Sequence, residues 1–268
     1  MTQNPDTKDY MMVLRCYEHG DLRNYLNINI KNIDYDTKIK NLFEFARGLL
    51  DIHDAGKVHK DLHSGNVLFT KNHNGYKSFS SISDLGMCQP ADNKEKQEGI
   101  YGVLPYVAPE VLRGSQYTQA ADVYSFGIIM NEFMSEEIPY NDIPHDQILT
   151  VRICNGLRPN ISEDTPKLFA DLIRKCWDAK PENRPTAREL VRVIRKWRSE
   201  IEDKNSVLYS QVKECEKIRK DKLKSKNNQT HPQAIYTSRL LNFKDLPKPA
   251  NSLELANYSN SLDLSSYF

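Results

Sequence analysis

The 268-residue chain lacks the features of several large classes of protein. It has no run of about 18 apolar residues, so we expect no membrane span. Residues 1–6 have neither a basic start nor an apolar stretch, so we expect no signal peptide. The five cysteines are scattered, and no two of them have the spacing of a zinc or redox motif. This pattern favours reduced thiols in a cytoplasmic protein, or in a nuclear one.

An excess of charge of one sign is also missing. The formal net charge is +1, which gives no support for nucleic-acid binding as the main task. Hydrophobic residues make up 39% of the chain, enough for one core but not for burial along the whole length. Charge dominates residues 204–226, and residues 251–268 are rich in Ser, Asn and Leu. We therefore predict a folded domain over residues 1–198 and a tail over residues 199–268 that is loosely helical and then disordered.

The apolar residues predict mostly helices. Residues 36–53 form an amphipathic pattern, and residues 120–134 are apolar on nearly every face, as in a helix inside a helical domain. Pro166 favours a helix start, and residues 186–189 form a capping box before another helix. The short apolar run at residues 10–17 predicts a buried strand.

Polar residues at fixed places fill the segment after the first long helix. Residues 59–66 (HKDLHSGN) pair the carboxylate of Asp61 with the amide of Asn66. Phosphoryl transfer needs an oriented acceptor hydroxyl and a divalent metal held against the phosphates. A carboxylate can accept the hydroxyl proton, and an amide oxygen suits Mg²⁺. Taken alone, the segment fits equally well a solvated Asp in a turn and an Asn that tolerates a left-handed backbone.

Further motifs follow in order. Residues 83–86 (SDLG) place a second carboxylate, Asp84, after a strand-like run, where it could bind a metal that bridges phosphates. Residues 106–110 (YVAPE), residues 122–127 (DVYSFG) and the pair Arg184-Pro185 come next. A buried Asp at a helix start and a Glu with a distant Arg partner are also compatible with purely structural roles.

These elements, in this order and at these separations, resemble the protein kinase family over roughly residues 10–198. The resemblance implies that residues 59–66 are the catalytic loop, with Asp61 and Asn66 catalytic. It implies that Asn66 and Asp84 bind Mg²⁺, with Leu85 where Phe is usual in the family. The implied fold is mainly α: a helical C-terminal lobe with a remnant hinge strand and short β-strands in the catalytic and metal-binding loops.

The resemblance also assigns supporting residues. Glu110 would pair with Arg184 and brace the substrate platform, and Asp122 would hold from below the backbone of the catalytic loop, to which His59 and Lys60 belong. The cofactors implied are ATP and Mg²⁺, and the partner implied is a protein substrate, with no nucleic acid.

The same resemblance places adenine between two segments. Leu14 would be the gatekeeper and residues 15–17 the hinge, which names Arg15, Cys16 and Tyr17 as adenine contacts. Leu68 would form the floor under the adenine ring.

The pattern departs from the family upstream of the hinge. The Gly-rich loop, the strand lysine and the helix glutamate of kinases precede the hinge strand, and only about nine residues precede Tyr10 here. We therefore expect this chain as given to be inactive or weakly active, whether it is a truncated gene product, a splice form or a degenerate relative. A pseudokinase-like binding module stays open as an alternative. So does a small-molecule kinase of the aminoglycoside or choline type, which uses a similar loop.

Three places in the sequence bear on the choice of substrate. His63 and Val103 stand where Ser/Thr kinases usually carry Lys and Thr, yet residues 153–159 resemble the tyrosine-kinase-like group, which favours Ser/Thr over Tyr as substrate.

Between Asp84 and Glu110 there is no Ser or Thr. Tyr101 is then the one good phosphate acceptor in this segment, because Tyr106 is expected to be buried in the core. A phosphate on Tyr101 could pair with the cation of Lys60. Glu95 and Glu98 are alternative sources of negative charge toward Lys60.

Overall fold

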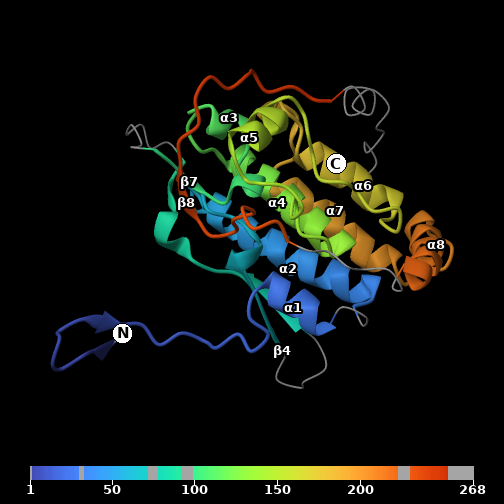
Figure 1. The fold of residues 1–268 in the computed structure, drawn as a ribbon. Helices are drawn as coiled ribbons and strands as arrows, with labels where there is room; N and C mark the ends of the chain where they lie inside the picture. Colours follow the sequence, from blue (N-terminus) through green and yellow to red (C-terminus); the bar gives the residue numbers. More distant parts are fainter. Residues whose placement is uncertain (1, 30–32, 72–77, 92–98, 223–229, 253–268) are drawn as a thin grey trace.

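A computed structural model of the chain describes residues 2–29, 33–71, 78–91, 99–222 and 230–252. Within these ranges the fold is mainly helical, as expected, with short strands joined in antiparallel pairs (Figure 1). The helices are α1 (Leu22–Asn29), α2 (Tyr35–Asp54), α3 (Pro109–Leu112), α4 (Gln119–Ser135), α5 (Gln147–Cys154), α6 (Lys167–Cys176), α7 (Ala187–Glu200) and α8 (Val207–Lys222). The strand pairs are β1 (Thr2–Gln3) with β2 (Tyr10–Met11), β3 (Lys57–Val58) with β6 (Gln89–Pro90), β4 (Val67–Lys71) with β5 (Ser78–Ile82), and β7 (Ile100–Gly102) with β8 (Arg239–Leu241).

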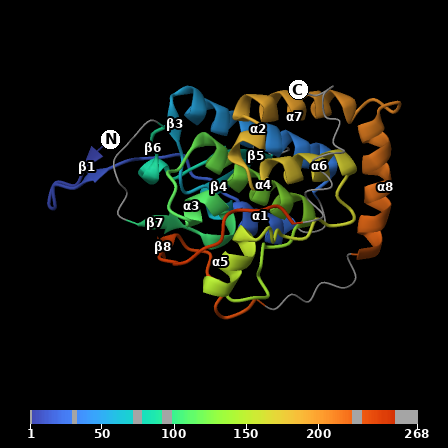
Figure 2. The same ribbon diagram turned by 90° about the horizontal axis from the view of Figure 1, so that it is seen from above.

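The long helices form the body of the molecule. Helix α2 packs against α7 and against strand β5, and α4 packs against α6 (Figures 1 and 2). Almost every residue of α4 is buried, which explains why its sequence is apolar on nearly every face. The core is closed by fully buried aromatic rings, of which Phe169 stacks on Trp197 with ring centroids 4.3 Å apart.

The predicted helices are present with small shifts at their ends. Helix α2 begins one residue before the predicted segment, because the Asp34 carboxylate accepts a hydrogen bond from the Thr37 amide at 2.7 Å. Gly56 follows this helix with a φ of 69°, in the left-handed region that glycine adopts readily. The capping box of α7 is confirmed, with Thr186 and Glu189 each bonded to the other's backbone amide.

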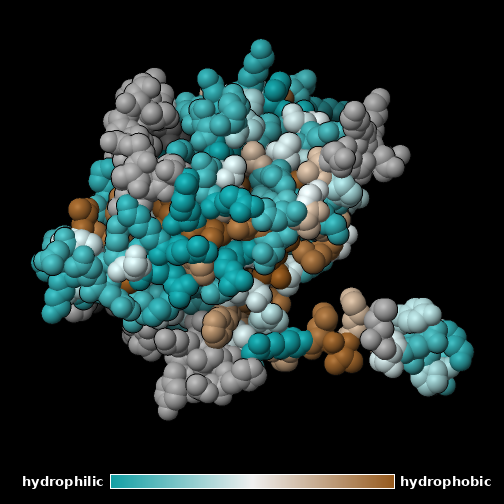
Figure 3. Space-filling view, turned by 180° about the vertical axis from the view of Figure 1, so that it is seen from behind, coloured by the Kyte–Doolittle hydropathy of each residue, from teal (hydrophilic) through white to brown (hydrophobic). Residues whose placement is uncertain are grey.

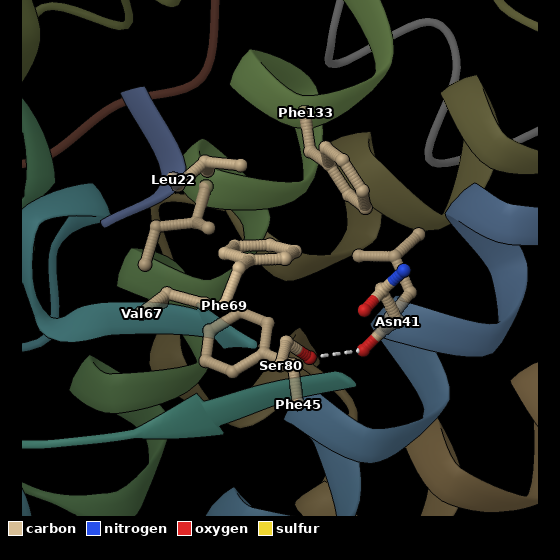
Figure 4. Close-up of a pocket in the computed structure, with 9 residues that line it drawn as sticks. Leu22, Asn41, Phe45, Val67, Phe69, Ser80 and Phe133 are labelled. Carbon is tan, nitrogen blue, oxygen red and sulfur yellow. Dashed lines mark hydrogen bonds between the residues drawn. The ribbon is translucent and has the colours of Figure 1, made fainter. Parts of the chain in front are cut away.

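The β4–β5 hairpin connects the helical body to the loops that carry the candidate site. Phe69 of β4 stacks on Tyr25 of α1, with centroids 4.1 Å apart and planes 7° apart. On β5, the Ser80 hydroxyl donates to the backbone carbonyl of Asn41 in α2 at 2.7 Å (Figure 4). Phe133 of α4 closes the other side of this cluster. The hairpin is therefore fixed to three helices, and its open end holds a defined position.

The expectation of a buried strand over residues 10–17 is wrong. Only β2 is a strand, and it pairs with β1 in a hairpin that stands away from the body (Figures 1 and 3). The side chains of Val13 and Leu14 are 86% and 74% exposed. Strand-forming residues become buried only when a sheet or helix covers them, and no other strand of the described chain lies beside this arm.

The tail begins with a helix, as expected, and continues with a segment that contacts the body where disorder was expected. Helix α8 packs against α7, and Arg219 of α8 forms an ion pair with Glu136. Residues 230–252 lie along the helical body in an extended conformation. Backbone hydrogen bonds fix this segment at both ends, from His231 to Asn141 at 2.7 Å and from Ala250 to Cys154 at 2.9 Å. The domain boundary near residue 199 stays a prediction.

The structure also bears on the expectations about membrane spans and cysteines. No described helix combines the length and apolarity needed to cross a bilayer. The five cysteines are all free thiols, and three of them are buried.

Candidate active site

The loop after β3 is held from below by one carboxylate. Asp122, near the start of α4, accepts hydrogen bonds from the backbone amides of His59 at 2.8 Å and Lys60 at 3.1 Å. Its Oδ2 also lies 3.0 Å from Nε2 of His53. Lys60 has a φ of 72°, an uncommon conformation for a residue with a side chain, and the bond to Asp122 stabilises it. The contact with the loop that the resemblance implies for Asp122 is thus present.

Asp61 and Asn66 lie together at the end of this loop. The side-chain amide of Asn66 donates to the backbone carbonyl of Asp61 at 2.9 Å, which closes the loop into a tight turn. The Asp61 amide donates to Nδ1 of His59 at 3.3 Å, so the ring proton of His59 is on Nε2, which lies 3.1 Å from the Ser83 carbonyl. His59 therefore connects the catalytic loop to the segment that carries Asp84.

The carboxylate of Asp61 is buried and has one polar neighbour within the loop. Nδ1 of His63 accepts from the Gly65 amide at 3.1 Å, so Nε2 carries the proton and faces Oδ2 of Asp61 at 3.7 Å. Burial by itself would raise the pKa of Asp61, but hydrogen bonding and charge from His63, with smaller effects of Ser238 and His59, lower it below its usual value. Asp61 is therefore held as a carboxylate, the form that can accept a proton.

Asp84 is placed next to Asn66 through its neighbour. The amide and the hydroxyl of Ser83 both donate to the backbone carbonyl of Asn66, at 2.9 and 3.0 Å. Asp84 has a φ of 58°, and one of its oxygens accepts from the Gly86 amide at 3.2 Å. Its side chain is exposed at the open end of the β4–β5 hairpin.

This pair suits a hard divalent cation. The Asn66 nitrogen is bonded to Asp61, so its amide oxygen is the group left for a ligand, and Asp84 adds carboxylate oxygens. No cluster of three or more His, Cys, Asp or Glu side chains that could hold a metal occurs among the described residues. A Mg²⁺ ion here would depend on phosphate oxygens and water for its remaining ligands, as is usual for Mg²⁺ at nucleotide sites.

Glu110 and Arg184 form the expected ion pair. Two parallel hydrogen bonds join Nη1 and Nη2 of Arg184 to the two carboxylate oxygens, at 2.7 and 2.8 Å. The Arg184 side chain is fully buried and also donates to the carbonyls of Ala120 and Asp178. The segment after Asp84 is thereby tied to the helices of the body at its far end.

Tyr106 is buried, as predicted, and links the segment between Asp84 and Glu110, which we call the activation segment, to the catalytic loop. Its hydroxyl donates to the buried carboxylate of Glu132 at 2.6 Å and lies 2.9 Å from the Ser64 hydroxyl. Arg23 donates to both Tyr106 and Glu132, at 3.0 and 3.3 Å. Sequence reasoning missed Glu132 and Arg23, and the available signal was a Glu within an otherwise apolar helix.

The two described residues that were expected to take part in regulation, Lys60 and Tyr101, differ in burial. Lys60 is largely buried, its Nζ lies 5.5 Å from the Tyr117 ring centroid, and burial lowers its pKa. Tyr101 is 44% exposed on β7, where its backbone pairs with Leu240. Glu95 and Glu98 lie outside the described residues.

The expected adenine residues lie on the N-terminal arm and on β4. Leu14, Arg15 and Cys16 are exposed on the N-terminal arm, and Tyr17 is half-buried where the arm meets the body. Leu68 is half-buried on β4, where its backbone forms an isolated antiparallel β-bridge with that of Asp21. The adenine contacts therefore stay a prediction.

The geometry of the loop, the two carboxylates and the ion pair agrees with comparison to known sequences. The chain belongs to the protein tyrosine and serine/threonine kinase family, which matches residues 2–194. This is a family of ATP-dependent phosphotransferases.

Several relatives carry serine/threonine-kinase names. The chain is 30% identical over 194 residues to a probable LIM domain-containing serine/threonine-protein kinase of Dictyostelium discoideum, covering 72% of this chain and 29% of that protein. It is 31% identical to a probable serine/threonine-protein kinase of the same organism, over 72% of this chain and 14% of that protein. A protein kinase and PP2C-like domain-containing protein of Arabidopsis thaliana is 28% identical, over 68% of this chain and 32% of that protein. The chain thus spans less than a third of the length of each of these relatives.

Proposed function

We propose that this chain carries the catalytic lobe of a protein kinase that transfers the γ-phosphoryl group of ATP to Ser or Thr of a protein substrate. The observation that carries the proposal is the tight turn that joins Asp61 to Asn66, with Asp122 bonded to the backbone of the same loop and Asp84 linked to Asn66 through Ser83. The bidentate pair of Glu110 with Arg184 supports a protein substrate, because it fixes the segment on which a polypeptide would lie.

The residues divide the work of phosphoryl transfer. Asp61 orients the acceptor hydroxyl and receives its proton, and the N–H of His63 favours the charged carboxylate beforehand. The oxygens of Asn66 and Asp84 would hold Mg²⁺, which would supply positive charge to neutralise the phosphates. Asp122 and His59 keep the loop in the geometry that this requires.

The choice of Ser or Thr over Tyr rests on likeness. The relatives that carry specific names are serine/threonine-protein kinases, and residues 153–159 resemble the tyrosine-kinase-like group. His63 in place of the usual Lys is the feature that departs from this assignment.

Nucleotide binding separates an enzyme from a binding module. We expect ATP to bind the purified chain more tightly with Mg²⁺ than without it, as measured by displacement of a fluorescent nucleotide. Asp84→Asn should abolish this Mg²⁺-dependent gain, because an amide is a weaker metal ligand than a carboxylate. Asp51→Asn, at an exposed position on α2, is the matched control and should behave as the unsubstituted chain.

Two other results would contradict parts of this proposal. Binding that is absent, or that Mg²⁺ does not strengthen, would favour the pseudokinase-like binding module for this chain. Phosphate transfer to a generic protein substrate that survives Asp61→Asn would remove Asp61 from its proposed role.

A further inference from the structure

Residues 230–252, which we call the strap, lie across the segment that follows Asp84. Strand β8 of the strap pairs antiparallel with β7, in the register Ile100 with Leu241, Tyr101 with Leu240 and Gly102 with Arg239. The two strands lie side by side in both views of the ribbon (Figures 1 and 2). The strap therefore covers the activation segment by adding a strand to it, which is one of the ways in which proteins bind extended peptides.

Side chains on both sides of β8 anchor the strap. Leu241 is 3% exposed and belongs to the main core. Arg239 donates to the carbonyl of His145 at 2.8 Å. The guanidinium of Arg23 lies 3.9 Å from the centroid of the Tyr236 ring, and the Tyr236 hydroxyl donates to the carbonyl of Pro139 at 2.8 Å. These contacts fix the register of the strap on both sides of Ser238.

The register brings Ser238 to the proposed proton acceptor. A methyl group placed on Gly102 would lie 3.8 Å from Oδ1 of Asp61, and Gly102 pairs with Arg239, the residue after Ser238. Oδ1 of Asp61 is buried and has no hydrogen-bond partner of good geometry among the described residues. Ser238 is the residue just before this pair, so the strap enters the β7–β8 pairing beside Asp61. Ser238 is itself exposed.

We propose that the strap occupies, within the same chain, the groove in which a protein substrate binds, with Ser238 in the position of the phosphate acceptor. The proposal rests on the proposed kinase function and names an occupant for its substrate groove. In the reaction, Oγ of Ser238 forms a bond to the γ-phosphorus of ATP and the bond from that phosphorus to the β–γ bridging oxygen breaks. ADP leaves, and the hydroxyl proton passes to Asp61.

Occupancy of the groove can be tested without catalysis. The probe is a fluorescent synthetic peptide of residues 233–245, added to the full chain. Leu241→Asp puts a charge into the core at β8 and should release the strap. The peptide should then bind this variant at least tenfold more tightly than the unsubstituted chain. Asn242→Asp adds the same carboxylate at the next, exposed position and should leave peptide binding unchanged.

Two results would overturn the groove assignment. One is peptide binding that is no tighter to the Leu241→Asp chain than to the Asn242→Asp chain. The other comes from amide hydrogen exchange of the unsubstituted chain, which depends on no variant. Residues 100–102 and 239–241 should be protected together, and rapid exchange of residues 239–241 would mean that β8 does not cover β7 in solution.

A separate measurement tests whether Ser238 is the phosphate acceptor. Because this chain is expected to be at most weakly active, the incubation with Mg-ATP is a long one; mass spectrometry should then find phosphate on Ser238 and none on the neighbouring Thr237, with the Asp61→Asn chain as the blank. Phosphate on an added protein substrate but not on Ser238 would contradict the assignment. Tight peptide binding without phosphate transfer to any acceptor would support the groove occupant and count against the kinase activity, so the two failures are distinguishable.

Discussion

At the scale of single residues, the buried pair of Glu110 and Arg184 should be costly to break. Glu110→Gln removes one charge and leaves the Arg184 guanidinium, whose side chain is fully buried, without a compensating anion. We expect a loss of about 3–5 kcal/mol in the free energy of unfolding, measured by chemical denaturation. Glu182→Gln, at an exposed position nearby, is the control. A loss below about 1 kcal/mol, the range of exposed pairs, would contradict the structural role of the pair.

Lys38 should make the free energy of unfolding depend on pH. Its ammonium is fully buried, and although Glu136 lies 3.0 Å away, burial lowers its pKa from 10.5 to about 8. Between these two values the unfolded chain binds a proton that the folded chain has released, so the stability of the folded state rises with pH. Below about pH 8 both states are protonated and this contribution is lost.

The comparison that isolates this effect uses Lys38→Met, in which Glu136 keeps its ion pair with Arg219. The unsubstituted chain should gain stability relative to Lys38→Met as pH rises from about 8 to 10.5, as measured by denaturation at several pH values. Lys40→Met, on the same helix but half-buried, controls for the loss of a lysine. A difference that does not change across this window would show that Lys38 keeps its proton.

At the scale of elements, the catalytic loop depends on the start of α4. Asp122→Asn replaces two acceptor oxygens by one, so one backbone amide of His59 or Lys60 loses its partner. We expect a cost of about 1–3 kcal/mol and faster hydrogen exchange at residues 59 and 60. Asp51→Asn should change neither quantity. Unchanged exchange in the Asp122→Asn chain would mean that the loop is held by packing alone.

Helix α7 is expected to depend on its cap. Thr186→Ala removes the side-chain oxygen that accepts from the Glu189 amide at 3.2 Å. The expected loss of stability is about 1 kcal/mol, visible in thermal or chemical denaturation. Ser199→Ala, in the last turn of the same helix, should cost less than about half of that. Equal effects of the two substitutions would argue against the capping box.

At the scale of the whole molecule, phosphate on Ser238 should release the strap. A negative group at this position would face the carboxylate of Asp61, and like charges at short range repel. Ser238→Glu should therefore expose Arg239 and Lys244 to trypsin, with cleavage several-fold faster than in the unsubstituted chain. Thr237→Glu carries the same charge one residue away and should leave the rate unchanged. Equal rates in the two variants would mean that charge at Ser238 does not control the strap.

Much of the helical body could be predicted from the sequence. The apolar stripe of α2, the buried character of α4 and the capping box of α7 are local patterns, since each depends on residues within one or two turns of each other. The order of the motifs also indicated the contacts of Glu110 with Arg184 and of Asp122 with the loop, because the resemblance to kinases supplied long-range partners that spacing alone does not.

What the sequence alone determined is therefore the family, the helices and the loop on which Asp61 and Asn66 lie. The tertiary structure decided the rest, and the strap and the N-terminal arm are the clearest cases. The strap lies in the tail that was expected to be a loose helix and then disordered, yet it pairs with the edge of β7 and places Leu241 in the core. The arm was expected to be buried because it is apolar, yet no sheet of the described chain covers it. In both, burial depends on a partner far away in sequence, and local composition carries no information about whether that partner is there.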